Sequence, residues 1–343
     1  MAEVFWRSWN KELEEQSIND LFDAILLKKP SPFPDHIIVP EFKENEKILI
    51  TTYIPSDFTL TENNSLMNLV SYVVALIPEY CQTEILLASS KQEITEIWTK
   101  RFTICKTLNN EPFIKLDKPK SDFSPFSSLP LKNDYLSDWY IPLSIDSANQ
   151  IIPVVPLKVS PIFQVAGVIS SFFWFLPTKT KNQILIQKTA EKRTEAFMEI
   201  LVLFFNRITL SGTLYQGQRN FSVFGNDPAS VDAFSSALMS IKASSVLTTK
   251  FCRKKKIGMG DLLKIHVQGE RFKKPILREQ PFNKRKYQLY FDINKCILEN
   301  KCIEACPSQA IFSQNGNLFY VKKQCVNCGL CISICPENAI KHV

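Results

Sequence analysis

Glycine is scarce in this sequence: only 9 of the 343 residues are glycine, where average usage would give roughly 7%. A glycine-rich loop that cradles phosphate groups is therefore not expected, and nucleotide binding through such a loop can nearly be dismissed. Histidine is also rare, with His36, His266 and His342 as the only three, and neither an H-x-x-x-H pair nor a nucleophile elbow is present. The residue chemistry of a self-contained enzyme is therefore not evident.

Long hydrophobic runs are absent as well. The most apolar stretch, residues 161–176, is 16 residues long, contains Gln164 and two serines, and is followed by Pro177. A membrane-spanning helix needs about 20 apolar residues, so we interpret this stretch as a buried core element, while contact of its aromatic side chains with a membrane surface stays open. The N-terminus has no basic segment followed by an apolar one, as a secretory signal would have. We expect a cytoplasmic protein without a transmembrane segment.

Cysteine, by contrast, is plentiful: seven of the ten cysteines fall between Cys296 and Cys335. In a cytoplasmic chain this number indicates metal or redox chemistry rather than a disulfide framework. The other three cysteines are scattered, and two of them, Cys81 and Cys105, lie at the edges of apolar stretches. We interpret these two as small buried hydrophobic residues; the third is Cys252.

Residues 325–336 read "CVNCGLCISICP", which is the pattern C-x2-C-x2-C-x3-C-P. This run holds [4Fe-4S] clusters in bacterial-type ferredoxins, where the fourth cysteine ligates the other cluster. A zinc site is the alternative, but zinc motifs pair two short knuckles, whereas here four cysteines follow one another at steps of 3, 3 and 4. Gly329 has no side chain to block the turn of the loop toward the cluster sulfides. The spacing favours iron–sulfur chemistry.

An earlier segment, residues 296–307, repeats the same frame with one change: Glu299 stands where the spacing requires a cysteine. The chain after each proline also matches, with "CPSQAIF" in the first half and "CPENAIK" in the second. Two matching halves indicate one pseudo-symmetric domain.

Over roughly residues 287–343 the chain resembles the two-cluster [4Fe-4S] ferredoxin family, and the crossed ligand pattern of that family implies two clusters. The first is a [4Fe-4S] cluster with four thiolates: Cys306, Cys325, Cys328 and Cys331. The second takes three thiolates, with Glu299 facing the remaining iron: Cys296, Cys302 and Cys335. The second site holds a [3Fe-4S] cluster, a [4Fe-4S] cluster with carboxylate or water on the fourth iron, or nothing. An oxygen donor holds iron less firmly than a thiolate and leaves the iron exchangeable. Glu299 is either a direct ligand of the fourth iron, or it points to solvent beside a three-iron cluster.

Strands and helices alternate in the larger part of the chain. Two strands are expected, over residues 47–54 and 83–88, with a helical pattern between them that ends before Pro78. A capping box at Ser90 predicts a second helix over 91–100. Further expected elements are a strand in 149–159, a helix passing into a strand over 194–205, and a helix that starts at Pro228 with Asp227 as its N-cap.

This alternation predicts an α/β fold, a parallel sheet with helices on its faces, followed by a small α+β ferredoxin-like iron–sulfur domain. We expect four parts: an N-terminal leader over residues 1–45, an α/β domain over 46–272, a basic linker over 273–288, and a two-cluster domain over 289–343. Residues 110–140, rich in Pro, Ser, Asp and Lys, read as a surface excursion.

Residues 220–270 resemble the closing segment of the domain of unknown function family 362, which often occurs beside ferredoxin modules. Asp227 and Asp232 match the two aspartates of its G-x-D-P-x-x-x-D signature, and Lys158 falls where the family carries a lysine after a buried strand. Where the family has a histidine two residues later, this chain has Ser160, and few titratable groups remain for a polar active site. The resemblance makes Lys158, Asp227 and Asp232 weak catalytic candidates, and a helix-capping or core-anchoring role is the alternative for both aspartates.

Basic residues concentrate between residues 250 and 288, where thirteen Lys or Arg stand against three Asp or Glu, although the whole chain carries a net charge of only +7. Such a segment would attract an acidic protein partner and speed the encounter. Binding of nucleic acid through "CRKKK" and "NKRK" is an alternative, but a basic run is more often a solvated face, and no aromatic platform is interleaved with it. We do not favour nucleic acid as a partner.

The sequence favours an iron–sulfur electron-transfer protein, in which the C-terminal clusters pass low-potential electrons to or from a redox partner protein docked on the α/β domain. The alternative is an iron–sulfur oxidoreductase: a reductase whose substrate pocket lies at the carboxyl ends of the strands, is fed by the clusters, and has Lys158, Asp227 and Asp232 around it.

Overall fold

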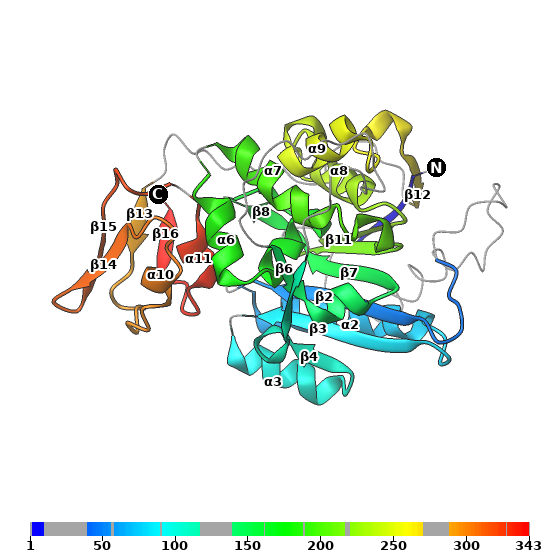
Figure 1. The fold of residues 1–343 in the computed structure, drawn as a ribbon, viewed down its shortest axis with the longest axis horizontal. Coiled ribbons are helices and arrows are strands. Elements are labelled where there is room, and N and C mark those ends of the chain that lie inside the picture. Colours follow the sequence, from blue (N-terminus) through cyan, green and yellow to red (C-terminus); the bar gives the residue numbers. More distant parts are fainter. Residues whose placement is uncertain are drawn as a thin grey trace.

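The computed structural model describes most of the chain, with gaps: residues 2–9, 40–55, 58–89, 91–116, 139–160, 162–187, 189–216, 220–269, 288–326 and 328–342. A larger α/β domain is built from residues up to 269. A smaller C-terminal domain begins at residue 288 and lies at the left of Figure 1.

The α/β domain is organised around one sheet of eight strands. In spatial order the strands are β12 (His266–Gly269), β1 (Glu3–Trp9), β11 (Asn220–Gly225), β10 (Ser211–Tyr215), β7 (Gln150–Pro156), β2 (Lys47–Ile54), β3 (Gln82–Ser89) and β4 (Cys105–Thr107). Neighbours from β10 to β4 are all parallel, whereas β11 runs antiparallel to both β10 and β1. The predicted α/β class is confirmed, with a sheet that is mixed but mostly parallel.

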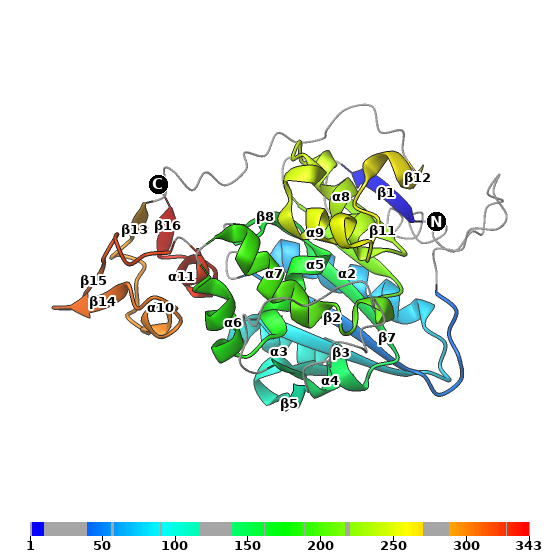
Figure 2. The same cartoon turned by 45° about the horizontal axis from the view of Figure 1, so that its top comes forward.

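Helices cover both faces of this sheet (Figures 1 and 2). They are α2 (Leu60–Leu76), α3 (Gln92–Arg101), α4 (Leu143–Ser147), α5 (Val168–Ser171), α6 (Thr178–Leu185), α7 (Ala190–Leu201), α8 (Pro228–Leu238) and α9 (Leu247–Lys255). Since successive side chains of a strand point to opposite faces, Ile48 and Ile50 of β2 pack with α2 and α3, while Leu49 packs with α7 on the other side. Burial on both faces explains the nearly continuous apolar runs of these strands.

Short elements connect the main ones. Two small antiparallel pairs are β5 (Phe113–Leu116) with β6 (Trp139–Pro142), and β8 (Lys158–Ser160) with β9 (Gln164–Ala166). Single 3-10 turns are η1 (Leu108–Asn110), η2 (Phe172–Phe175), η3 (Phe205–Arg207), η4 (Ala243–Ser245) and η5 (Leu262–Lys264).

Local sequence signals fix several helix starts. Thr59 and Glu62 form a capping box before α2: the Thr59 hydroxyl accepts from the Glu62 N–H at 3.2 Å, and the Glu62 carboxylate accepts from the Thr59 N–H at 2.7 Å. The predicted start of α8 is also confirmed, because Asp227 accepts from the Ser230 N–H at 2.7 Å and Pro228 follows it. Helix α3 occupies the predicted place, whereas Ser90, the predicted cap, lies outside the described residues.

The region 194–205 differs from the prediction. Helix α7 ends at Leu201 and is followed by η3, and the next strand, β10, starts only at Ser211. An apolar run of this kind cannot be assigned to strand or buried turn by periodicity alone. Phe204 and Phe205 are buried in the core between the two elements.

The N-terminal leader also differs in part. Residues 3–9 form β1, which pairs with β11 on one side and β12 on the other, and Val4 and Trp6 are buried. This segment therefore belongs to the α/β domain. The sequence did not predict this strand, because it is only seven residues long and a longer polar, proline-containing segment follows it. Residues 10–39 lie outside the described part of the chain.

The apolar stretch 161–176 is a buried core element, as predicted. It forms β9, α5 and η2, and the side chains of Phe172, Phe173 and Phe175 are fully buried. Among the helices of the described residues, none is long and apolar enough to span a membrane.

The C-terminal domain contains β13 (Leu289–Phe291), α10 (Lys301–Glu304), β14 (Ile311–Gln314), β15 (Asn317–Tyr320), α11 (Leu330–Ile334) and β16 (Ile340–His342). Strand β13 pairs with β16, and β14 and β15 form a hairpin whose turn residues, Asn315 and Gly316, have φ of 49° and 73°. Such angles are those of a tight hairpin turn. Both views place α11 beside α6 of the α/β domain (Figures 1 and 2).

Candidate metal centre

The two halves of the C-terminal domain have matching backbones. Asn300 and Gly329 occupy equivalent places before α10 and α11, with φ of 60° and 73°. The next pair of equivalent residues, Gln309 and Asn338, has φ of 51° and 50°. The left-handed conformation turns the chain at the same points in both halves, which confirms the internal symmetry that the sequence indicates.

The last cysteine of each half accepts a backbone hydrogen bond. The Ala310 N–H donates to Cys306 Sγ at 3.2 Å, and the Ala339 N–H donates to Cys335 Sγ at 3.3 Å. Both donors lie four residues after the cysteine. Donors of this kind stabilise negative charge on sulfur that ligates a metal.

Burial and neighbouring cysteines raise the pKa of three cysteines of the domain. Burial raises the pKa of Cys302 to about 11, and Cys335 and Cys296 add to the effect. Burial likewise raises the pKa of Cys328 to about 11, with Cys306 and Cys325 adding to it. The pKa of Cys331 is well above its usual value, first through burial and then through the thiolates of four cysteines: Cys328, Cys325, Cys306 and, last, Cys302.

The two crossed ligand sets that the ferredoxin resemblance implies stay a prediction. We call them the four-thiolate site (Cys306, Cys325, Cys328 and Cys331) and the three-thiolate site (Cys296, Cys302 and Cys335). The three cysteines of the second set line one small cavity. Among the described residues no group of three or more His, Cys, Asp or Glu side chains is placed to hold a single metal ion. Thiolates are the ligands of iron–sulfur clusters, so the donor set of seven cysteines fits such clusters.

Glu299 lies at the three-thiolate site. It lines a small cavity of about 30 Å³ together with Cys296, Cys302 and Cys335. Its carboxylate oxygen Oε2 is 2.6 Å from Nζ of Lys301, and both side chains are partly exposed. The altered position is therefore next to the thiolates that the sequence assigned to it, and its role as an iron ligand stays a prediction.

The four-thiolate site faces the α/β domain. Cys328 and Leu330 belong to the same buried cluster as Phe197 of α7, and Val326 packs against that cluster. The Arg193 guanidinium donates to the Val326 carbonyl oxygen at 3.0 Å and to that of Gln187 at 2.9 Å. Arg193 is only 4% exposed; burial lowers its pKa, and the neighbouring Cys328 thiolate acts in the opposite direction.

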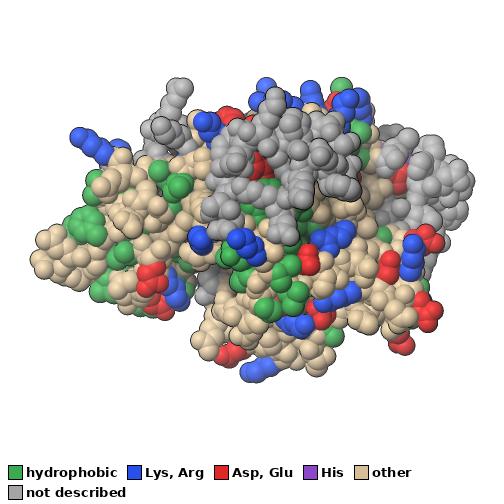
Figure 3. All heavy atoms as spheres, in the orientation of Figure 1, with side chains coloured by type: hydrophobic (Ala, Val, Ile, Leu, Met, Phe, Trp, Pro, Cys, Tyr) green, Lys and Arg blue, Asp and Glu red, His purple; other side chains and the backbone are tan. Residues whose placement is uncertain are grey.

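The three-thiolate site is more open. Ile293, Ile297 and Leu298, which surround Cys296 in the sequence, are 67%, 59% and 40% exposed. Figure 3 shows hydrophobic side chains on the surface of the C-terminal domain at the left of the view. The chain around Cys296 is thus exposed, whereas Cys328 is buried at the contact with the α/β domain.

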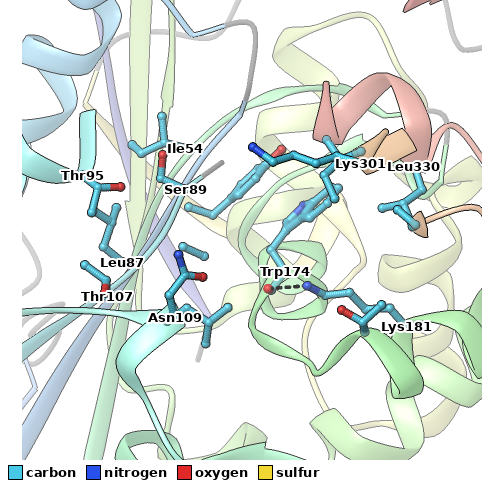
Figure 4. A pocket seen from close by; sticks show the side chains of 16 residues that line it. Ile54, Leu87, Ser89, Thr95, Thr107, Asn109, Trp174, Lys181, Lys301 and Leu330 are labelled. Atoms are coloured by element: carbon cyan, nitrogen blue, oxygen red, sulfur yellow. Dashed lines mark hydrogen bonds between the residues drawn. The ribbon is translucent and has the colours of Figure 1, made fainter. Parts of the chain in front are cut away.

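A pocket of about 300 Å³ lies where the two domains meet. Figure 4 shows Ile54, Leu87, Ser89, Thr95, Thr107 and Asn109 on one side of it and Trp174, Lys181, Lys301 and Leu330 on the other. The first side is formed largely by the carboxyl ends of β2, β3 and β4 and the residues after β4. In the second, Ala305 and Leu330 are chain neighbours of cysteines of the four-thiolate site, and Lys301 and Ile334 are chain neighbours of cysteines of the three-thiolate site.

The three weak catalytic candidates lie elsewhere and do not line this pocket in the described part of the chain. Lys158 Nζ is 3.9 Å from Glu62 Oε1 and 5.1 Å from the centre of the Phe58 ring. Asp227 caps α8 and also accepts from the Met259 N–H at 3.2 Å.

Asp232 is buried and accepts from two backbone groups, the Val168 N–H at 2.7 Å and the Ile169 N–H at 2.9 Å. It therefore holds the start of α5. Both aspartates make the capping and core-anchoring contacts that the sequence left as the alternative, since one sequence cannot distinguish an acid that caps a helix from an acid in a pocket.

The basic segment is described only in part, because residues 270–287 lie outside the described residues. Its "CRKKK" portion forms the last turn of α9, in which Arg253, Lys254 and Lys255 follow the buried Cys252. Basic side chains in a last turn are favoured by the helix dipole, which accounts for this run without nucleic acid.

Sequence reasoning did not find Trp174, Lys181 or Arg193. Trp174 is part of an apolar run, and Lys181 and Arg193 are ordinary charged residues of helices α6 and α7. No local pattern marks them, because each acquires its place only through contact with a distant segment.

The family model described as "4Fe-4S dicluster domain" matches residues 288–336. The C-terminal domain is therefore an iron–sulfur domain of the two-cluster type, attached to an α/β domain. The match ends there, so the resemblance of residues 220–270 to the domain of unknown function family 362 stays a prediction.

No curated protein matches this chain. A solved structure of a protein from Thermotoga maritima is similar over 61% of this chain and 52% of its own length, with 13% identity and a TM-score of 0.35. The chain thus spans about half the length of that structure.

Proposed function

We propose that this protein transfers electrons through its C-terminal domain. The observation that supports this most is the match of residues 288–336 to a 4Fe-4S dicluster domain, together with the cavity that Cys296, Cys302 and Cys335 line in common. Clusters bound there supply one-electron chemistry at low potential. The chain's own residues bind them through thiolates, donate backbone N–H groups to sulfur, and exclude water from the inward side.

Burial of Cys328 against the α/β domain and exposure of the chain around Cys296 suggest a relay from one site to the other. A redox partner protein has access to the exposed rim of the three-thiolate site, where Ile293, Ile297 and Leu298 are exposed. The thirteen Lys or Arg against three Asp or Glu between residues 250 and 288 favour an acidic partner. In this proposal the partner exchanges electrons with the three-thiolate site. The four-thiolate site exchanges electrons with a molecule bound to the α/β domain.

A reductase is the second candidate, and the pocket between the domains favours it. A reductase of this kind adds two electrons, one at a time through the C-terminal domain, and two protons to a double bond of the bound molecule. The electrons come from a low-potential protein donor. The two protons come from solvent water.

Glu299→Cys tests the proposed function. Wild-type protein purified without oxygen is expected to contain iron and sulfide and to show, by electron paramagnetic resonance, one ordinary reduced [4Fe-4S] signal and a second, distinct one. The substitution completes the cysteine frame, so the two signals become alike. Glu304→Cys is the matched control. It adds a thiol at an exposed place between Cys302 and Cys306 that is not one of the ligand positions of the frame.

Two results would count against these ideas. Identical spectra for the wild type and Glu299→Cys would remove the special role of Glu299. Colourless protein, or protein that binds zinc instead of iron, would overturn electron transfer altogether.

Arg193→Met is expected to make the reduction potential of the four-thiolate cluster more negative by tens of millivolts, where about 59 mV is a tenfold change for one electron. The reason is that the buried guanidinium beside Cys328 favours the more negative, reduced state. A redox titration followed by electron paramagnetic resonance measures this shift.

Arg207→Met is the control for Arg193→Met. Arg207 is also partly buried and donates to the carbonyl oxygens of Asp146 and Ala148, at 2.7 and 2.8 Å, in the α/β domain. A shift of equal size in both variants would show that Arg193 acts through general destabilisation and not through its charge.

A further inference from the structure

The pocket between the domains has the features of a small-molecule site. Its volume of about 300 Å³ is at the lower end of the range for ligand pockets. It lies at the carboxyl ends of parallel strands, close to the point where the strand order reverses between β2 and β7. Ligands of open α/β sheets bind at such places.

The pocket wall carries two cations and no acid. Lys181 and Lys301 are the charged side chains among the described residues that line it, and neither Asp nor Glu is among them. Lys181 Nζ donates to the Trp174 carbonyl oxygen at 2.8 Å, and burial lowers its pKa to about 8. An anion in the pocket would compensate the burial of this ammonium group.

Lys301 connects the pocket to the three-thiolate site, because it lines both cavities. Its ammonium group is paired with the Glu299 carboxylate at 2.6 Å. The charge of Lys301 is therefore compensated by Glu299, and Lys181 is the lysine of the pocket wall to which an anion is assigned.

A flat aromatic wall stands beside the cations. The rings of Tyr53 and Trp174 are stacked, with centroids 4.8 Å apart and an angle of 6° between the planes. Lys181 Nζ is 5.8 Å from the centre of the Trp174 ring. A flat ligand fits along such a wall better than a branched one.

The remaining walls combine apolar and hydroxyl groups. Leu330, Ile334 and Ala305 of the C-terminal domain form an apolar surface, and the opposite side presents hydroxyl and amide groups of Ser89, Thr95, Thr107 and Asn109. Apolar walls with a few polar groups are typical of sites that bind and orient an organic molecule.

We propose that this pocket binds a small organic anion with a flat conjugated body, an aromatic or α,β-unsaturated carboxylate, with the carboxylate at Lys181 and the flat body along Tyr53 and Trp174. This inference rests on the proposed function, because it names the substrate class of the reductase candidate. Binding itself needs no electron flow and is tested separately.

Isothermal titration calorimetry of the oxidised full-length protein tests the proposal, with trans-cinnamate and 2-naphthoate as probes and their neutral amides for comparison. At least one acid is expected to bind with one site per chain and at least about tenfold more tightly than its amide, because a desolvated charge pair is lost in the amide. Lys181→Met lowers the affinity for the acid by about tenfold or more, whereas Lys181→Arg retains most of it.

Lys179→Met is the matched control: Lys179 lies on the same helix, is exposed, and does not line the pocket. It is expected to bind the acids like the wild type. Equal affinity for acid and amide, unchanged affinity in Lys181→Met, or no binding of either acid would overturn the proposal.

The visible absorption of the same samples separates this proposal from the proposed function. Coloured, iron-containing protein that binds neither acid retains electron transfer and loses the ligand site. Colourless protein that binds the acid retains the site and loses electron transfer.

Discussion

Cys328→Ala is expected to lower the iron content by at least about one atom per chain, because three thiolates can hold a three-iron cluster but not an ordinary [4Fe-4S] cluster, and to remove the ordinary reduced [4Fe-4S] signal of the four-thiolate site. Cys328 is one of the four thiolates grouped there, and alanine has no atom that ligates iron. The effect extends beyond the cluster, because Cys328 also packs in the buried cluster that joins the C-terminal domain to the α/β domain. Iron and sulfide counting, with electron paramagnetic resonance of the reduced protein, measures the loss.

Cys105→Ala is the control for this prediction. Burial raises the pKa of Cys105 to about 12, which keeps the thiol protonated, and the residue belongs to β4 of the α/β domain. Its removal should leave iron and sulfide unchanged. A Cys328→Ala protein with the wild-type iron content would refute the ligand assignment.

Asp232→Ala is expected to lower the free energy of unfolding by about 2–5 kcal/mol. The carboxylate is 2% exposed and accepts from the N–H groups of Val168 and Ile169, which alanine would leave buried without this partner. The midpoint of urea unfolding, followed by circular dichroism, measures the change. Ser230→Ala is a comparison from the same helix, since it removes a buried hydroxyl that donates to one carbonyl, and it should cost much less.

The stability of the wild type should also depend on pH through Asp232. Burial raises the pKa of Asp232 to about 7, above the roughly 3.9 of an unfolded chain. The contribution of this group is therefore fully present below about pH 4 and is lost as the pH rises through about 7. Asp232→Asn, which does not titrate, should lack this loss. Equal slopes of stability against pH between 4 and 7 in both proteins would contradict the raised pKa.

Much of the fold was predictable because its signals are local. Strand β2 occupies residues 47–54 as expected, and Asp227 caps α8 where the N-cap and the following proline indicate a helix start. The place of β1 was not predictable, because this strand of seven residues joins the sheet, next to the edge strand β12, only through pairing with β11 and β12, which lie more than 200 residues away in the chain.

The sequence by itself determined the metal chemistry, because cluster ligands are held by short loops and their spacing is visible in the chain. Only the tertiary structure decided which way each site faces. Arg193 reaches the four-thiolate site, and Tyr53, Trp174 and Leu330 share one pocket, because side chains far apart in sequence were packed together when the apolar surfaces of the two domains met. Such contacts follow from the burial of surface and leave no periodic trace in the residues that make them.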